Sequence, residues 1–194
     1  MTHNNDLDIT PSLTGKLLIA MPQMGDPRFH KAVIFVCAHD NNGAMGLVIN
    51  HILPGVDLNE LLAQLNIADT VTQSHDIPVM SGGPVETARG FILHKGHFDQ
   101  IESLNIESDI YVTGTLDALR AIARGQGPKD MLFILGYAGW SAGQLDQEMQ
   151  HNSWLVIDAD PAIMFAGHPE EIWERAIKKI GVDPLMLFSD IGHA

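Results

Sequence analysis

The stretch MLFILGYAGWSAGQLDQEMQ, residues 131–150, joins the most hydrophobic segment of the chain to a polar one. Residues 131–139 form an apolar run that predicts a buried strand, central to its sheet. The residues that follow, up to Gln150, are polar and suited to a helix. Three glycines, a tryptophan and a glutamine lie at the junction, within positions 136–144. Whether this junction binds a ligand or only starts a helix decides much of the functional interpretation.

The junction carries the sequence pattern of a helix N-terminus. If Ser141 is the N-cap, Gln144 falls at the third helical position and completes a capping box. Trp140 and Leu145 would then flank the cap as a hydrophobic staple. In this interpretation the conspicuous residues of the junction have structural roles.

The glycines of the junction are not explained by capping alone. Gly143 would lie in the first helical turn, where glycine costs about 1 kcal/mol relative to alanine. Gly136, Gly139 and Gly143 also allow close approach by another strand, or by a small anionic ligand at the helix N-terminus. Their spacing matches neither the dinucleotide fingerprint nor a phosphate-binding loop. A ligand here would have Asn50 and His94 as candidate neighbours.

The same residues contain a weak signal for a nucleophile. Residues 139–143, GWSAG, fit the pattern G-x-S-x-G between a hydrophobic strand and a helix, which is the context of a nucleophile elbow. Asp158 could supply the acid of a triad, and His151 or His168 the base. The repeated parallel units of a hydrolase fold are missing, so Ser141 is only a weak catalytic candidate.

The rest of the chain predicts a mixed α/β (α+β) fold in a single compact domain. Several strands are joined by short turns, which favours a mixed sheet with flanking helices over a doubly wound parallel sheet. Asp57 and Thr115 are suitable N-caps, and residues 95–109 are expected to be mostly loop. The domain is expected over 12–194, after a flexible polar tail at 1–11. The predicted strands are 16–22, 31–39, 45–50, 77–82, 91–94, 110–114, 131–139 and 153–159, and the predicted helices are 57–67, 116–125, 142–150 and 169–180.

Composition limits the classes of partner. The chain has 11 Lys and Arg against 24 Asp and Glu, a formal net charge of −13. Nucleic-acid binding depends on basic residues that neutralise phosphates, so direct binding to nucleic acid is not expected. The longest apolar stretch, 32–38, is far shorter than a membrane span. The N-terminus lacks the pattern of a signal peptide, and we expect a cytoplasmic protein.

Cysteine and histidine give no strong site. Cys37 is the only cysteine, which excludes an intrachain disulfide and favours a reducing compartment. It lies in a hydrophobic strand and is expected to be inert, although a cation such as His39 would leave reactivity open. His94 and His97 are three residues apart across a predicted strand end, not on a helix. We therefore predict neither a metal site nor a cofactor.

Four segments together resemble the AlgH/YqgE family of bacterial proteins. They are LTGKLLIAMPQMGDPRFHKAVIFVCAHDNNGAMGLVIN (13–50), SGGPVETARGFILH (81–94), GYAGWSAGQLDQEM (136–149) and NSWLVID (152–158). The resemblance extends from about Ser12 to about Ile180. It implies one compact α/β domain with a mixed, partly bifurcated sheet.

The resemblance also implies a role, but no catalytic residues. Some family members are linked to regulation of alginate production and described as transcriptional regulators. The matched positions that the resemblance marks are Asp26, Asn50, His94, Trp140 and Gln144. It also implies that the position of Ser141 holds a small residue that need not be serine, which weakens the nucleophile hypothesis.

Two functions follow as expectations. The first is a regulatory or interaction module without a defined catalytic site, acting on a protein partner or a small anionic ligand. The alternative is a small-molecule-binding protein or hydrolase with a pocket at the Gly139–Gly143 helix N-terminus. Its expected ligand-binding residues are Asn50, His94, Gly139, Trp140, Gly143 and Gln144. Oligomeric state and the presence of any enzymatic activity are left open by the sequence.

Overall fold

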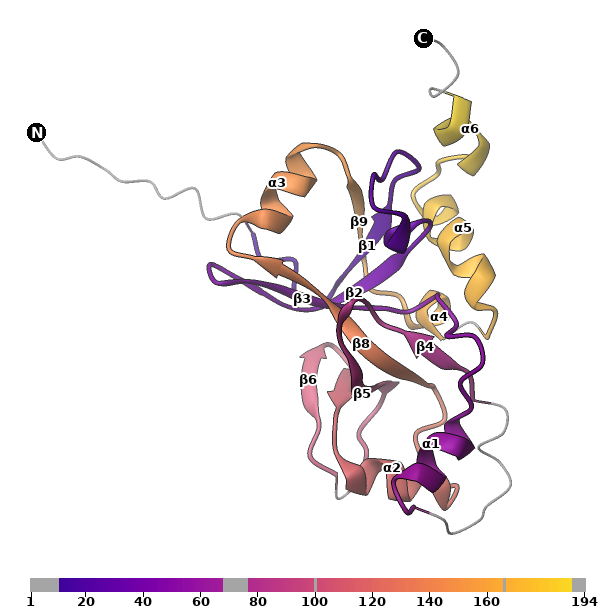
Figure 1. Cartoon of the computed structure of the whole chain (residues 1–194). Coiled ribbons are helices and arrows are strands. Elements are labelled where there is room, and N and C mark those ends of the chain that lie inside the picture. The colour runs from indigo at the N-terminus through magenta and orange to yellow at the C-terminus, as the bar shows by residue number, and fades with distance from the viewer. Residues whose placement is uncertain (1–10, 68–76, 100, 166, 190–194) are drawn as a thin grey trace, which may run out of the picture.

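A branched β-sheet organises the protein, as the computed structural model shows (Figure 1). The structure describes residues 11–67, 77–99, 101–165 and 167–189. The predicted tail at 1–11 therefore lies, apart from its last residue, outside the described residues. Eight strands follow one another in the order β6 (Leu104–Glu107), β7 (Ile110–Thr113), β5 (Val85–Lys95), β8 (Met131–Ser141), β3 (Gly43–Val48), β2 (Val33–Asp40), β1 (Lys16–Ala20) and β9 (Trp154–Asp158), and β4 (Val79–Ser81) pairs with β8 off this path.

Strand β8 is the branch point of the sheet. One edge of β8 pairs antiparallel with β5. Its other edge pairs antiparallel with β3 at residues 138–141 and parallel with β4 at residues 133–135. The end of β3 and the chain that follows it are hydrogen-bonded to β4 and the residue after it. Val48 N–H donates to Gly82 O, and Ser81 N–H donates to His51 O. β4 thus fills a fork between β3 and β8, and the mixed, partly bifurcated sheet is confirmed.

Glycines permit the chain to cross the fork. β4 and β5 lie on opposite edges of β8, so the connection between them passes over β8. A Cβ on Gly82 would collide with the carbonyl of Gly136, and one on Gly83 with the backbone of Tyr137. Gly136 itself has φ 73°, a left-handed conformation that favours glycine. Close approach of strands explains these glycines without a ligand.

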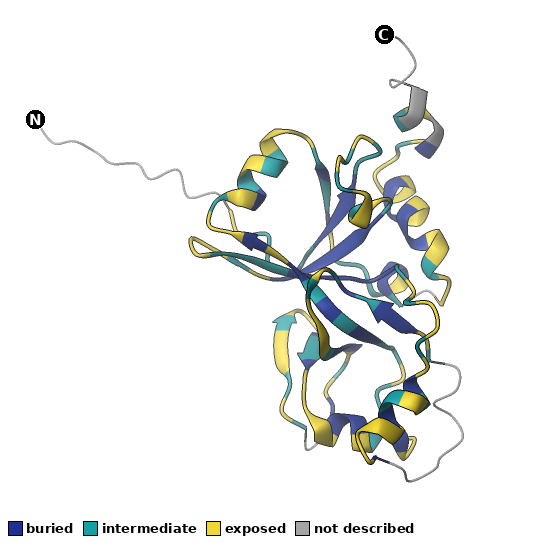
Figure 2. Cartoon of the chain, in the orientation of Figure 1, coloured by how far each residue is buried: buried dark blue, intermediate teal, exposed yellow. Residues whose placement is uncertain are grey.

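Helices cover the sheet in three groups (Figure 1). α4 (Pro161–Met164) and α5 (Pro169–Lys179) pack on the largest core, which includes Phe35 and Trp173. α3 (Gln144–Gln150) covers a second core that contains Trp140 and Trp154. α1 (Leu58–Gln64) and α2 (Leu116–Ala123) cover a third at the far end of the molecule. Figure 2 shows the buried strands at the centre and the helices exposed on their outer sides.

Most predicted elements are present, with informative exceptions. Asp57 and Thr115 are the N-caps of α1 and α2, and they accept hydrogen bonds from Asn59 N–H and Ala118 N–H. Residues 95–109, predicted as loop, contain the edge strand β6, which is short, largely exposed and paired only with β7. Three short helical elements were not predicted: the 3-10 helix η1 (Pro27–Phe29), α4 and α6 (Pro184–Ser189). In the described part of the chain, no helix has the length and apolar character to span a membrane.

Candidate functional site

The junction between β8 and α3 differs from the prediction at its cap. β8 continues through Ser141, because Gly43 of β3 pairs with that residue. The N-cap of α3 is Gly143, with φ 71° and ψ −3° and no side-chain cap. The prediction of Ser141 as N-cap is therefore wrong. One hydrogen bond of the predicted capping box is present, because Gln144 Oε1 accepts the backbone N–H of Ser141 at 3.1 Å. The same oxygen also accepts the Ser141 hydroxyl at 3.2 Å.

Of the two junction glycines nearest to α3, the backbone conformation explains Gly143 but not Gly139. A Cβ on Gly143 would meet nothing within 4 Å, so its left-handed φ is what favours glycine there. A Cβ on Gly139 would meet only side-chain atoms of Tyr137 and Val85, at 3.4 and 3.6 Å. At neither position would a Cβ collide with another part of the protein.

Trp140 and Gln144 take part in a carboxylate clamp under α3. One oxygen of Glu148 accepts hydrogen bonds from the indole N–H of Trp140 at 2.9 Å and of Trp154 at 2.8 Å. Its other oxygen accepts from Gln144 Nε2 at 3.0 Å. The two indole rings meet edge to face, with centroids 6.1 Å apart. The clamp ties α3 to β8 and β9. Sequence reasoning missed this role of Glu148, because its separations of eight and six residues from the tryptophans match no recognised motif.

Ser141 has no base beside it. Its side chain is exposed, and its hydroxyl is bonded to Gln144. Asp158 pairs instead with Lys16 at 2.7 Å, which lowers the pKa of Asp158 through their hydrogen bond. His168 lies 3.7 Å from Glu170. Among the described residues no histidine nitrogen hydrogen-bonds to Ser141, so the structure does not assemble the triad considered above.

Asn50 holds the chain that leads into β2. Its Oδ1 accepts from Val33 N–H at 2.8 Å, and its Nδ2 donates to Lys31 O at 2.8 Å. His51 Nε2 donates to His30 O at 3.0 Å, and burial lowers the pKa of His51. Both side chains are thus engaged with the segment before β2, in a network separate from the junction at α3.

Asp26, also marked by the resemblance, stabilises the same segment from its other end. Its carboxylate caps η1 by accepting from Arg28 N–H at 3.0 Å. It also pairs with the Arg28 guanidinium at 2.6 Å, and that hydrogen bond lowers the pKa of Asp26. This arrangement orders a turn and leaves the carboxylate committed to its own helix.

His94 is fully buried in a hydroxyl–imidazole chain. Its Nδ1 donates to the carbonyl of Gly96 at 3.0 Å, which leaves Nε2 as the acceptor for the Thr113 hydroxyl at 3.0 Å. The Ser103 hydroxyl pairs with Thr113 at 2.6 Å. The ring stacks on Tyr111, with centroids 5.6 Å apart and planes at 13°. Burial lowers the pKa of His94, which favours its neutral form.

Metal and thiol chemistry are not built into the described part of the chain. His97 is exposed and lies 3.4 Å from Asp99, away from the buried hydrogen bonds of His94. No group of three or more His, Cys, Asp or Glu among the described residues could hold a metal ion. Burial raises the pKa of Cys37 to about 12, so its thiol stays protonated and unreactive at neutral pH.

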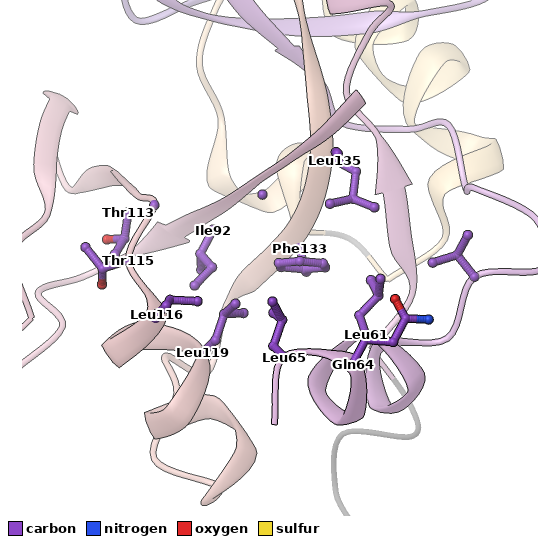
Figure 3. Close-up of a pocket in the computed structure, with 14 residues that line it drawn as sticks. Leu61, Gln64, Leu65, Ile92, Thr113, Thr115, Leu116, Leu119, Phe133 and Leu135 are labelled. Atoms are coloured by element: carbon purple, nitrogen blue, oxygen red, sulfur yellow. The ribbon is translucent and has the colours of Figure 1, made fainter. Parts of the chain in front are cut away.

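Among the described residues, a concave site lies between α1 and α2, next to Thr113. It is a cavity of about 500 Å³ over the faces of β5 and β8 (Figure 3). None of the described residues that line it is charged, and most are apolar. Phe133 and Leu119 are buried at its base, whereas Leu65 and Leu116 are about half exposed. The apolar side chains that face one another across it are Leu61, Leu65, Ile92, Leu116, Leu119 and Phe133.

Sequence reasoning missed this cavity, although one signal was present. The helix predicted at 57–67 has four leucines at helical spacing, Leu58, Leu61, Leu62 and Leu65, of which Leu58 and Leu62 are buried. Leu65 is 48% exposed, because the core beneath α1 does not extend to it. When a helix carries more apolar side chains than the core beneath it buries, the exposed ones point to an unfilled cavity beside the helix.

Comparisons with known proteins agree on a single family. The sequence pattern of the AlgH-like family matches residues 17–185. A UPF0301 protein from Methylocella silvestris is 49% identical over 189 residues, covering 94% of this chain and 92% of that protein. A UPF0301 protein from Paracoccus denitrificans is 47% identical over 192 residues, covering 97% and 100%.

Two solved structures are similar over nearly their whole lengths. The solution structure of AlgH from Pseudomonas aeruginosa is 40% identical in sequence, with a TM-score of 0.77 and complete coverage of both chains. A crystal structure of a Corynebacterium diphtheriae protein is 19% identical, with a TM-score of 0.70, and covers 94% of this chain and 93% of its own. The second likeness concerns the fold alone.

Proposed function

Because the chain belongs to the AlgH-like family, we propose that it is a regulatory module that acts by binding a small molecule between α1 and α2. The observation that carries the proposal is the apolar cavity of about 500 Å³. Ligand sites in proteins commonly have volumes of about 300–1,000 Å³ and mainly hydrophobic walls. The regulatory part of the proposal rests on the resemblance to regulators of alginate production.

The half-exposed leucines support a site that is completed by a ligand. Leu65 and Leu116 are 48% and 51% exposed at the two helices that border the cavity. Burying apolar surface stabilises a complex by about 25 cal/mol per Å² removed from water. A ligand that covers these side chains would gain this free energy, and it would also bridge two helices that otherwise pack separately on the sheet.

The geometry favours this site over the Gly139–Gly143 junction. α3 has only seven residues, and Ser141, Gln144 and Glu148 are bonded to one another at the junction. Asp146 Oδ1, in the first turn, is buried without a hydrogen bond from any described residue and lies 3.7 Å from His39 Nε2. Among the described residues no histidine nitrogen is hydrogen-bonded to Ser141, as a hydrolase would require. We place the expected small-molecule function at the cavity instead.

Direct binding to nucleic acid is not part of the proposal. Seven of the eleven basic residues are paired with carboxylates, which reduces the charge available for phosphates. These are Lys16, Arg28, Arg89, Arg120, Arg175, Lys178 and Lys179. The proposal also includes a protein partner that binds the ligand-bound form. It places the protein in the cytoplasm, because the single, buried Cys37 suits a reducing compartment.

A thermal-shift screen of the full chain tests the proposal. The panel contains nucleotides, sugar phosphates, acyl-CoAs, divalent metals and uncharged apolar compounds. A ligand at 100 times its dissociation constant stabilises the folded state by about 2.7 kcal/mol. For a chain of this size that corresponds to a rise in Tm of roughly 5–10 °C.

A matched pair of variants locates the site. Ala88 is exposed and lines the cavity, so Ala88→Trp should fill the cavity and abolish the shift. Thr87 is its exposed neighbour and does not line the cavity, so Thr87→Trp should retain the shift. A panel without any shift would contradict the proposal, and a shift that both variants retain would place the ligand elsewhere.

A further inference from the structure

The polar side chains at the cavity wall are largely committed to partners within the protein. The Thr113 hydroxyl is bonded to His94 and Ser103, and Thr113 itself is 1% exposed. The Thr115 hydroxyl accepts from Ala118 N–H at 3.2 Å as the cap of α2. In Figure 3 both threonines lie at one edge of the cavity, away from Leu61 and Gln64 at the other.

Among the described lining residues, Gln64 is the polar side chain at the edge opposite the threonines (Figure 3), and it is exposed at the end of α1. Its amide can meet a polar group at the solvent side of the cavity. It carries no charge that could neutralise an anion or a cation in the interior. The base of the cavity, formed by Ile92, Leu119 and Phe133, offers only hydrocarbon.

This distribution decides the class of ligand that the cavity can hold. A charged group moved from water into an apolar site costs free energy unless a counter-charge or hydrogen bonds compensate it. The described lining residues provide no counter-charge. The buried Thr113 hydroxyl is already bonded, and the exposed Thr115 hydroxyl accepts the cap bond of α2. Hydrocarbon, in contrast, gains free energy with every methylene that is buried.

We propose that the cavity binds an uncharged hydrocarbon chain, with the polar end of the ligand towards Gln64 and solvent. The inference rests on the proposed ligand-binding function and narrows its ligand class. It replaces the small anionic ligand of the sequence analysis with a ligand whose buried part is apolar. Leu65 and Leu116, half exposed on opposite helices, would cover the chain where it enters.

The test uses N-phenyl-1-naphthylamine, an uncharged fluorescent probe, titrated into the full chain. Primary alcohols of six to twelve carbons then compete for the probe, alongside carboxylates of the same lengths. We expect the affinity of the alcohols to rise by up to about fourfold per methylene until the cavity is filled. Carboxylates of equal length should bind at least about tenfold more weakly, because no charge among the described lining residues compensates the partial desolvation of a carboxylate beside Gln64.

Variants connect the competition to this cavity. Leu116→Lys places a charge beside the entrance and should weaken alcohol binding by about tenfold or more. Leu104→Lys is the matched control, because Leu104 is 66% exposed and does not line the cavity. Ala88→Trp should abolish binding, and Thr87→Trp should preserve it.

Several outcomes would overturn the inference, and they separate it from the proposed function. Carboxylates that bind as tightly as alcohols, or a charged panel compound that Ala88→Trp displaces, would refute the ligand class and leave the ligand site intact. Failure of the probe, the alcohols and the whole thermal panel would refute both. An amphipathic Leu/Lys peptide that displaces the probe, when alcohols do not, would assign the cavity to a protein partner.

Discussion

The region under α3 and the region between α1 and α2 use their side chains in opposite ways. Under α3, one carboxylate of Glu148 satisfies Trp140, Trp154 and Gln144, and the aromatic rings pack against one another. Between α1 and α2, leucines are left half exposed around a cavity of about 500 Å³. The first region satisfies both indole N–H groups, although Asp146 Oδ1 in the first turn of α3 is buried without a hydrogen bond to the described part of the chain. The second region leaves apolar side chains exposed around a cavity.

The difference shows that residues that are conspicuous in the sequence need not line the cavity of the structure. A tryptophan, glycines and a glutamine drew attention to the junction at 136–144. Hydrogen bonds account for Trp140 and Gln144, and close packing or backbone conformation accounts for Gly136 and Gly143. The candidate site is built from leucines, isoleucine and phenylalanine, whose types are ordinary in any core. Four predictions test whether the two regions differ in this way.

The largest effect is expected at the carboxylate clamp. Glu148→Ala leaves two buried indole N–H groups without an acceptor, and each unsatisfied buried donor costs about 1–3 kcal/mol. We expect the free energy of unfolding, measured in urea, to fall by about 2–4 kcal/mol. Glu148→Gln is the control, because its amide oxygen can still accept one or both bonds and should lose less. Equal losses in the two variants would show that the hydrogen bonds do not stabilise this region.

The next effect is expected at the cap of α3. Gly143→Ala forces a Cβ into a left-handed conformation, which costs roughly 1–2 kcal/mol. Gly139→Ala serves as the control, because Gly139 has no positive φ and its Cβ would meet atoms only at 3.4 Å and beyond. Denaturant unfolding of both variants measures the difference. A larger loss at Gly139 would mean that close packing, and not the backbone at Gly143, governs the junction.

A change of pH is expected to have a smaller effect on the free energy of unfolding, because only one proton is bound at each of two histidines. Burial lowers the pKa of His94 and of His51 below the ordinary value of 6.5. The unfolded chain therefore binds more protons than the folded chain just below pH 6.5, and stability is lost as pH falls from there through the folded pKa values. Stability should be constant with respect to these groups above pH 6.5.

Unfolding curves between pH 5 and 7.5 measure this slope. The carboxylates with lowered pKa, such as Asp26 and Asp158, titrate below this window and do not contribute to it. His94→Gln should reduce the slope, and His94→Gln combined with His51→Gln should remove most of it. An unchanged slope in the double variant would contradict the assignment.

The smallest effect on stability is expected at the rim of the cavity. Leu65→Gln and Leu116→Gln replace half-exposed side chains, so the free energy of unfolding should change by no more than about 0.5 kcal/mol. Leu62→Ala, at a position 4% exposed on the same helix as Leu65, should cost about 2–5 kcal/mol. Large losses at both rim positions would show that this region is a completed core, and the comparison would fail.

Local patterns predicted those parts of the fold that depend on near neighbours. The apolar run at 131–139 gave a central strand, and Asp57 and Thr115 gave the caps of α1 and α2. The cap at α3 was wrong because a distant strand, β3, pairs with β8 as far as Ser141. β6 was missed because a short edge strand with one partner carries little hydrophobic signal.

The candidate site could not be predicted for a related reason. Its walls come from two helices and three strands, in segments that are separated in the sequence, at 56–65, 88–92, 113–119 and 133–135. Whether their leucines meet or leave a space depends on how far apart the sheet holds the helices. Asn50 and His94 were predicted near a ligand, but their polar atoms are engaged in two separate buried networks.

The position of β8 in the fork has a consequence for the order in which the chain can acquire its structure. β3, β4 and β5 all precede β8 in the sequence, and each pairs with it along one edge. Until residues 131–141 are available, these three strands have backbone groups without partners, and such edges invite association between chains. During synthesis, about two thirds of the chain is therefore made before β8 can join the sheet. β8 must then pair with strands on both of its edges and pack closely against Gly82 and Gly83. Folding that waits for distant pairing is slow, and the emerging chain would benefit from protection by a chaperone until β8 arrives.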